Sequence, residues 1–349
     1  MMNASLLRPL GWTGVGLALA GAVGLSLIGS PVHADSVSDF YHGKTIEHDV
    51  GSGVGGGYDL YARLMARYMG NYIPGKPVII VKNIVGGGGI RAANLLYNVS
   101  PRDGSVIATV SRAMITAPLM GTESAKFDPA KFTWIGAITH ETSLCVAWHT
   151  AKVKNWDDVL KTKLLVGTAA PGTTTYSLPL MLQRMFGAKF ELISGYSDAS
   201  RTVLAMEREE VDGLCQTYSS LRTQHPTWIK DGTVNVIAVL ALERNADLPN
   251  APAAIEFAKN DEQKAILKVV LGPDFAGGPL FAPPGIPADR THALQDAFNK
   301  AMKDPALLAD AKKQKFDIHP TTGEELAALV NDIQSTPASL VAKVKAITE

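Results

Sequence analysis

Apolar segments followed by glycines and then by a helical pattern recur in the first third of the chain. The alternation predicts strands at residues 44–50 and 106–110 and amphipathic helices at 58–71 and 91–97. The short apolar run 78–81 predicts a further strand, buried on both faces. Strand, loop and helix therefore occur twice in succession, which favours a βαβαβ unit with a parallel sheet.

The same order returns in the middle of the chain and predicts a second α/β region. The strands expected there are 132–138, 144–147, 164–167, 190–193 and 234–240, and the helices are 155–160, 178–186 and 202–208. The strand 234–240 is expected to lead back towards the first region. Because it is rich in glycine and proline, segment 277–287 is expected to be a rigid connection to closing helices at 288–302 and 324–333.

This order of elements predicts an α/β protein with two lobes. We expect lobe 1 to comprise residues 35–143 and 244–349, and lobe 2 to comprise residues 144–243. Each lobe is expected to hold a mostly parallel sheet flanked by helices. A chain that leaves one lobe, builds a second and returns leaves a cleft between them, where ligands often bind.

The first 34 residues have the features of an export signal. Arg8 supplies positive charge, residues 11–28 are apolar with many small side chains, and residues 31–34 end in the small-x-small pattern that signal peptidase cuts. We expect cleavage after Ala34. The apolar run is about 18 residues long, near the minimum for a bilayer span, so a membrane anchor is the alternative.

The charge balance gives no electrostatic reason for a polyanionic partner. The chain has 33 Lys+Arg and 33 Asp+Glu. Removal of residues 1–34 takes away Arg8 and no acidic residue, which leaves a net charge of about −1. We therefore expect no binding to nucleic acid or to an anionic membrane surface.

The chain contains two cysteines, Cys145 and Cys215, each within an apolar run. An oxidising compartment would allow a disulfide between them. A free cysteine in apolar surroundings behaves as a small hydrophobe. Pairing cannot be read from sequence; the surroundings favour two free, buried thiols.

The glycine-rich stretch Val50–Asp59 carries the clearest chemical signal. Its glycines allow positive φ angles and a close approach of the backbone to a ligand. The helix that follows begins with unpaired N–H groups and the positive end of the helix dipole. This arrangement suits a phosphate or carboxylate, and a glycine turn without a ligand is the simpler alternative.

Two further loops offer similar groups. Asn83 and the glycines 86–89 follow the second strand, and both glycine loops lie at carboxyl ends of strands, where open α/β sheets bind ligands. In the second region, loop 168–176 holds three consecutive threonines before a helix. Their hydroxyls can donate to a ligand, and helix capping alone is the alternative.

The fingerprint of dinucleotide-binding enzymes is incomplete. Gly51, Gly53 and Gly56 match its glycine spacing, but the second predicted strand ends in Lys82 and Asn83. The acidic residue that would hold the ribose hydroxyls is therefore missing. An NAD-dependent oxidoreductase is accordingly disfavoured.

The motifs of hydrolases and metal sites are also incomplete. The closest approach to a nucleophile elbow, residues 195–199, lacks its second glycine. The eight histidines are scattered, and a pair such as His140 and Glu141 is more typical of surface or hydrogen-bonded residues than of metal ligands. We therefore predict a non-enzyme with no catalytic residues, no metal and no cofactor.

Taken together, these segments resemble the receptor proteins of tripartite tricarboxylate transporters, also called Bug-type periplasmic solute-binding proteins. The resemblance covers essentially the whole chain after residue 34. It rests on these segments in this order and spacing: Gly53–Asp59, Asn83 with 86–89, 92–94, 96–97, 101–104 and 281–287.

The resemblance implies a periplasmic-binding-protein-like fold whose lobes close on a small organic acid, a di- or tricarboxylate or a related carboxylate. It implies delivery of this ligand to a permease with one large and one small membrane subunit. The ligand carboxylate is expected between the first strand–helix loop, 55–59, and loop 168–176 of the second lobe. We expect a monomer in the periplasm; a secreted enzyme and a receptor for a signalling partner are the alternatives.

The predicted ligand-binding residues come from both lobes. They are Gly55, Gly56, Gly57, Tyr58, Asp59, Asn83, Gly87, Gly88, Arg112, Thr168, Gly172, Thr173, Thr174, Thr175, Tyr196 and Asp198. Asp198 could accept from a ligand amine or hydroxyl, and Arg112 or Arg201 could pair with a distal carboxylate. The second-lobe segments depart from the family's usual pattern, so the sequence does not name the ligand.

Overall fold

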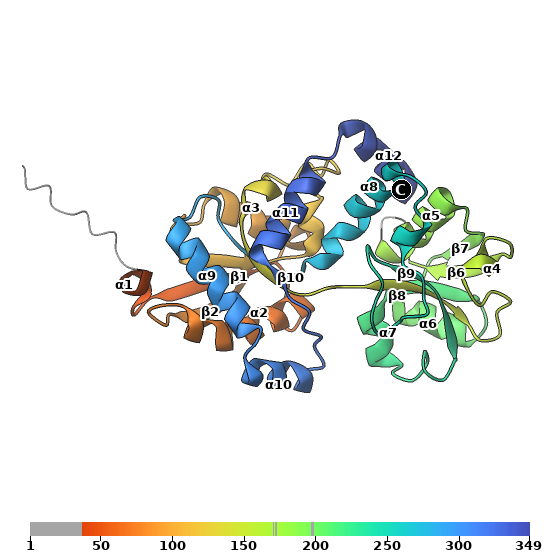
Figure 1. Cartoon of the computed structure of the whole chain (residues 1–349), viewed down its shortest axis with the longest axis horizontal. Coiled ribbons are helices and arrows are strands. Elements are labelled where there is room, and N and C mark those ends of the chain that lie inside the picture. The colour runs from red at the N-terminus through yellow and green to blue at the C-terminus, as the bar shows by residue number, and fades with distance from the viewer. Residues whose placement is uncertain (1–36, 170, 172, 197–198) are drawn as a thin grey trace, which may run out of the picture. The chain divides into compact units, whose positions relative to one another are not determined.

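Two mixed β-sheets, each flanked by helices, make up the protein (Figure 1). The structure is a computed structural model that describes residues 37–169, 171, 173–196 and 199–349. The expected export signal and two predicted ligand residues, Gly172 and Asp198, lie outside the described residues. The predicted α/β fold class is confirmed.

The first sheet has the strand order β11-β4-β10-β3-β1-β2. Its strands are β1 (Thr45–Val50), β2 (Val78–Asn83), β3 (Val106–Thr109), β4 (Thr133–Thr139), β10 (Gly277–Ala282) and β11 (Thr321–Thr322). Strand β1 pairs in parallel with β2 and β3, and the helices α2 (Gly57–Tyr68) and α3 (Ile90–Asn98) connect these three strands. The predicted βαβαβ unit is therefore confirmed. The pairs of β10 with β3 and β4, and of β11 with β4, are antiparallel.

Strand β2 differs from its prediction as a strand buried on both faces. It lies at the edge of the sheet, and Val78 and Ile80 are 64% and 54% exposed. Ile79, which points to the opposite face, is buried in the core with Leu64 and Met65 of α2. A continuous apolar run does not distinguish an edge strand from a central one, so the prediction was wrong.

The glycine- and proline-rich segment 277–287, predicted to be a connection, contains the buried strand β10. This strand lies between β3 and β4 in the middle of the first sheet. Space explains its glycines: a Cβ on Gly277 would lie 2.5 Å from the backbone oxygen of Thr139. Close packing, rather than a turn, requires glycine here.

The second sheet has the strand order β7-β6-β8-β5-β9. Its strands are β5 (Ser143–Trp148), β6 (Leu164–Thr168), β7 (Phe190–Ser194), β8 (Gly213–Thr217) and β9 (Val234–Leu240), and the helices between them are α4 (Trp156–Val159), α5 (Thr174–Phe186), α6 (Ala199–Glu207) and α7 (Tyr218–Gln224). Strand β6 is parallel to β7 and β8, whereas β5 is antiparallel to β8 and β9. Both sheets are thus mixed rather than mostly parallel, and the predicted lobe boundaries stay a prediction.

The remaining helices pack against both sheets. They are α1 (Val37–Tyr41), α8 (Asp261–Leu271), α9 (Ala288–Ala301), α10 (Pro305–Lys313), α11 (Gly323–Gln334) and α12 (Ala338–Thr348), with short 3₁₀ helices η1 (Met69–Tyr72), η2 (Gly87–Gly89), η3 (Arg112–Ile115), η4 (Pro129–Lys131), η5 (Ala254–Phe257) and η6 (Gly272–Phe275). Phe298 of α9 and Leu326 of α11 belong to cores of the first sheet, and Leu267 of α8 belongs to a core of the second. Among the described residues, no helix has both the length and the apolar character of a membrane span.

Cys145 and Cys215 form a disulfide between β5 and β8. The two residues are directly opposite each other in the antiparallel pair, and both are buried. The expectation of two free thiols is therefore wrong. The apolar run around each cysteine was recognised, but the register between strands that lie 70 residues apart could not be derived from it.

Replacing both cysteines, Cys145→Ala with Cys215→Ala, should lower the free energy of unfolding by about 4 kcal/mol, because closing a loop of this length restricts the unfolded chain. Urea denaturation measures this change. As a control, the wild-type protein unfolded without reductant should take up no iodoacetamide. Two alkylated cysteines in that control would contradict the disulfide.

Candidate functional site

The two glycine loops of the first sheet contact each other at the carboxyl end of β1. A Cβ on Gly51 would lie 2.7 Å from Gly89 Cα and 2.9 Å from Val110 Cγ1. Gly89 itself has a φ of 100°. Any side chain at Gly51 would therefore separate the loops, so glycine is required for their approach.

The carboxylate of Asp59 holds the first glycine loop in place. Asp59 is 1% exposed, and its Oδ2 accepts hydrogen bonds from Gly55 N–H at 2.8 Å and from Arg63 Nε at 2.9 Å. Its Oδ1 accepts from Asn83 Nδ2 at 2.8 Å, and the same amide nitrogen donates to Ser52 O at 2.9 Å. Both carboxylate oxygens of Asp59 thus accept hydrogen bonds from other groups of the protein, as expected of a residue that positions the loop.

These contacts keep Asp59 ionised. Burial acts to raise its pKa, but the hydrogen bonds from Arg63, the Gly55 N–H and Asn83 outweigh burial and lower the pKa to about 2. At neutral pH the ionised carboxylate of Asp59 therefore holds the first glycine loop through hydrogen bonds.

Helix α2 begins without a side-chain cap. Its N-cap residue is Gly56, and the first intrahelical hydrogen bond runs from Leu60 N–H to Gly56 O at 3.0 Å. The N–H groups of Gly57 and Tyr58 precede that bond, and Gly57 is exposed. The turn therefore presents backbone donors at the positive end of a helix.

Arg112 lies near this loop, but its charge is already paired. Tyr58 Oη accepts a hydrogen bond from Arg112 N–H at 3.3 Å, and Arg112 Nε donates to Asp274 Oδ1 at 2.8 Å. Burial raises the pKa of Asp274 to about 6, an effect that Arg112 partly offsets. The structure thus brings two of the predicted ligand residues, Tyr58 and Arg112, together, and also shows a carboxylate partner that the sequence did not reveal.

The loop after β6 is held together by its own hydroxyls. Thr175 Oγ1 accepts from Ala169 N–H at 3.3 Å and lies 3.1 Å from Thr173 Oγ1. Thr168 is fully buried, with its hydroxyl 3.1 Å from Ser194 Oγ on β7. Tyr196 packs at the same end of the sheet, because a Cβ on Gly167 would lie 3.4 Å from its ring.

Helix α5 also begins without a side-chain cap. The carbonyl oxygen of its N-cap residue, Thr173, accepts from the N–H groups of Tyr176 at 3.0 Å and Ser177 at 2.9 Å. The N–H groups of Thr174 and Thr175 come before these bonds, and Thr174 is exposed. Helix α5 thus repeats the arrangement at the start of α2.

The predicted residues therefore form two groups. Contacts link the residues of the first glycine loop with Asn83 and Arg112, and Gly87 and Gly88 are exposed in the second glycine loop beside them. Other contacts link Thr168, Thr173, Thr175 and Tyr196 at the end of the second sheet. The joining of the two groups around one ligand stays a prediction.

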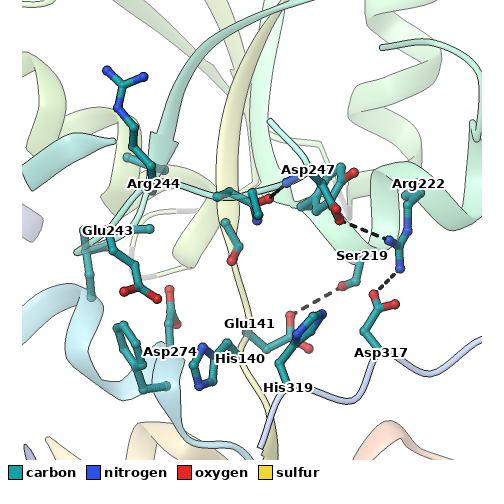
Figure 2. A pocket seen from close by; sticks show the side chains of 18 residues that line it. His140, Glu141, Ser219, Arg222, Glu243, Arg244, Asp247, Asp274, Asp317 and His319 are labelled. Atoms are coloured by element: carbon teal, nitrogen blue, oxygen red, sulfur yellow. Dashed lines mark hydrogen bonds and ion pairs between the residues drawn. The ribbon is translucent and has the colours of Figure 1, made fainter. Parts of the chain in front are cut away.

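A cavity of about 240 Å³ lies elsewhere, where the chain passes between the two sheets. Segment 140–142 between β4 and β5, segment 241–247 after β9 and the residues Asp317 and His319 line it (Figure 2). The sequence pattern gave no signal for this cavity because its lining residues are scattered along the chain.

Five carboxylates surround the cavity, those of Glu141, Glu243, Asp247, Asp274 and Asp317. Arg222 lies 3.6 Å from Asp247 and also pairs with Asp317 (Figure 2). The acidic excess disfavours an organic anion here. The cavity is therefore a poor site for a carboxylate ligand.

His140, which also lines the cavity, is hydrogen bonded to Thr321 Oγ1 at 2.8 Å. Burial lowers its pKa. The interpretation of His140 as a hydrogen-bonded residue is confirmed. Within the part of the chain that the structure describes, no cluster of three or more His, Cys, Asp or Glu could hold a metal ion.

The family model described as tripartite tricarboxylate transporter family receptor matches residues 62–345. The chain belongs to this family, whose members are solute-binding receptors. The chain is also 25% identical over 321 residues to a UPF0065 protein from the TAR-I ttuE-ttuC′ intergenic region of Agrobacterium vitis, a match that spans 89% of this chain and 83% of that one.

Solved structures share the fold. A TctC solute-binding protein from Polaromonas, without ligand, is similar with a TM-score of 0.70 at 19% identity, over 87% of this chain and 99% of that one. MatC from Rhodopseudomonas palustris, with bound malate, is similar with a TM-score of 0.53 at 20% identity, over 88% of this chain and 99% of that one. The two-lobed periplasmic-binding-protein fold is thereby confirmed.

The contact between the glycine loops can be tested with a pair of substitutions. Gly51→Ala should lower the free energy of unfolding by about 2 kcal/mol, because its Cβ would overlap Gly89 and Val110. Gly53→Ala is the matched control, since a Cβ there meets nothing within 4 Å, and it should change stability by less than about 0.5 kcal/mol. Equal effects in urea denaturation would contradict the close approach.

The role of Asp59 can be tested through pH. Asp59→Asn should lower the free energy of unfolding at pH 7 by about 2 kcal/mol, because charge-assisted hydrogen bonds become neutral ones. The pKa of Asp59 is about 2 in the folded protein, below its ordinary value of 3.8. Its contribution is therefore present above about pH 4 and is lost as the pH falls towards 2.

Urea denaturation of wild type and Asp59→Asn at several pH values measures this contribution. The difference between the two proteins should shrink as the pH is lowered from 5 to 3. A difference that stays constant over this range would show that the ionised carboxylate does not hold the loop.

Proposed function

We propose that this protein is an extracytoplasmic receptor that captures a small di- or tricarboxylate, or a related carboxylate, and delivers it to a tripartite membrane transporter. One observation carries the proposal: α2 and α5 each begin without a side-chain cap, after the loop that follows the carboxyl end of a parallel strand in their own sheets. Family membership and the malate bound to a protein of the same fold support it.

Backbone N–H groups at helix starts suit a carboxylate for electrostatic reasons. They offer directed donors and a partial positive charge without a fixed cation. Arg112 is paired with Asp274 and Arg63 with Asp59, so neither guanidinium near the first loop brings an unpaired charge. In this proposal Gly57, Tyr58 and Thr174 bind the ligand, and Asp59 and Asn83 position the first loop.

Capture would proceed by closure of the two lobes. The carboxylate first binds the donors of one loop, and contacts with the second loop then favour the closed form. The ligand shifts this equilibrium only as far as it binds the closed form more tightly than the open one. Binding thus performs the function, and no covalent step is involved.

The cellular setting is part of the proposal. We infer that residues 1–34 direct export, with cleavage after Ala34, and that the receptor acts as a periplasmic monomer. Its partners would be a large and a small membrane subunit. The alternatives are a receptor for a signalling partner and a secreted enzyme. Uptake by membranes that contain these subunits, on addition of the purified protein, would favour the transport receptor over the signalling receptor. Turnover of a carboxylate by the purified protein would favour the enzyme.

A proline substitution tests the helix start directly. Thr174 is the first residue of α5, a position where proline fits the helix geometry but lacks an N–H donor. Thr174→Pro should weaken binding of malate about tenfold, the effect of one lost hydrogen bond to a charged group. Isothermal titration of protein lacking residues 1–34, refolded to remove bound ligand, measures the affinity.

Asp261→Pro is the matched control, because Asp261 is the first residue of α8 and its N-cap, Asn260, is likewise extended. It should leave the affinity unchanged. If malate does not bind, the same titration with citrate and adipate identifies the acid to use. Unchanged affinity in Thr174→Pro would contradict the assignment of α5, and absence of binding to any of the three acids would contradict the proposed function.

A further inference from the structure

One side chain of the second sheet, outside the two groups of predicted ligand residues, is buried without a hydrogen-bond partner among the described residues. Gln216 of β8 is 4% exposed, and neither its side-chain nitrogen nor its side-chain oxygen has a partner. Two half-buried glutamines do have partners: Gln183 donates to Phe190 O at 3.0 Å and Gln295 to Trp134 O at 3.0 Å. Gln216, which is more deeply buried, leaves both its amide donors and its oxygen acceptor unused.

An unpaired buried amide is destabilising. A buried polar atom without a hydrogen bond loses its hydration without compensation, and an apolar side chain of similar shape would avoid this cost. The ligand-free conformation of Gln216 also has no side-chain hydrogen bond to lose. A change of its χ angles that gained partners would therefore be favourable.

Gln216 lies near the carboxyl end of β8, the strand next to β6 in the sheet. Gly167 of β6 pairs with Leu214 of β8, and Gln216 lies two residues further towards the carboxyl end. Alternation along the strand puts Gln216 on the same face as Leu214. Leu214 shares a core with Tyr196, whose ring packs against Gly167. Gln216 thus lies on the face that also carries Tyr196, whose backbone N–H donates to Thr168 O at 3.4 Å, at the sheet end where the proposed ligand loop begins.

The chemistry of the amide defines what it can recognise. A side-chain amide offers two N–H donors and one oxygen acceptor. A carboxylate ligand satisfies only the donors, because an ionised carboxylate cannot donate. A hydroxyl or ammonium group on the ligand would satisfy the oxygen as well.

We propose that Gln216 determines specificity by binding a hydroxyl or amino substituent next to the ligand carboxylate. The preferred ligands are then hydroxy- or amino-substituted dicarboxylates rather than plain ones. This inference rests on the proposed function, because it requires a carboxylate at the loop after β6.

Three acids with the same carbon skeleton test the inference: succinate, malate, which adds a hydroxyl, and aspartate, which adds an ammonium group. The wild-type protein should bind malate or aspartate about tenfold more tightly than succinate, as expected for one hydrogen bond to a site built to receive it. In Gln216→Leu this preference should disappear through weaker binding of the substituted acid, while the affinity for succinate is unchanged. Isothermal titration measures all affinities.

Stability provides an independent readout. Gln216→Leu should raise the melting temperature of the ligand-free protein, because it removes an unsatisfied buried amide. The matched control is Gln295→Leu, which removes the bond to Trp134 O in the first sheet. It should lower the melting temperature and leave the preference among the three acids intact.

The outcomes separate the two proposals. If the wild-type protein binds these acids but shows no preference for a substituted one, or if Gln216→Leu keeps the preference, the role of Gln216 is overturned and the proposed function stands. If the wild-type protein binds none of the three acids, nor citrate or adipate, both proposals are overturned.

Discussion

The candidate site depends on one carboxylate. Asp59, fully buried in the first turn of α2, accepts hydrogen bonds from Gly55 N–H, from Arg63 and from Asn83. These bonds hold the glycine loop beside the helix, and no side chain caps the start of α2. Without them, a stretch with this many glycines would lose its shape, since glycine restricts the backbone least of all residues.

The two sheets share one arrangement, which we propose binds an anion. In each, a parallel strand ends in a loop, and a helix without a side-chain cap follows. In the proposed function, backbone donors hold the carboxylate, so nearby side chains are free to select among carboxylates. Under that proposal the class of ligand follows from the fold, while the particular ligand depends on single residues such as Gln216.

Local patterns predicted the elements but not their long-range pairing. Strand β1, helix α2 and the two glycine loops followed from residues that are close in sequence. The position of β10 in the centre of the sheet and the Cys145–Cys215 disulfide depend on registers between distant segments. For the same reason, the sequence indicates Asp59 as a ligand residue but does not reveal its hydrogen bond from Asn83, which lies 24 residues away.

The most direct test is to observe the backbone N–H groups of both loops while a carboxylate is added. In ¹⁵N-labelled protein titrated with malate, the amide resonances of Gly57, Tyr58, Thr174 and Thr175 should shift together and give one dissociation constant. That result would show that both helix starts bind the same ligand. Shifts confined to the residues around the acidic cavity, such as Glu141 and Arg222, would contradict the account.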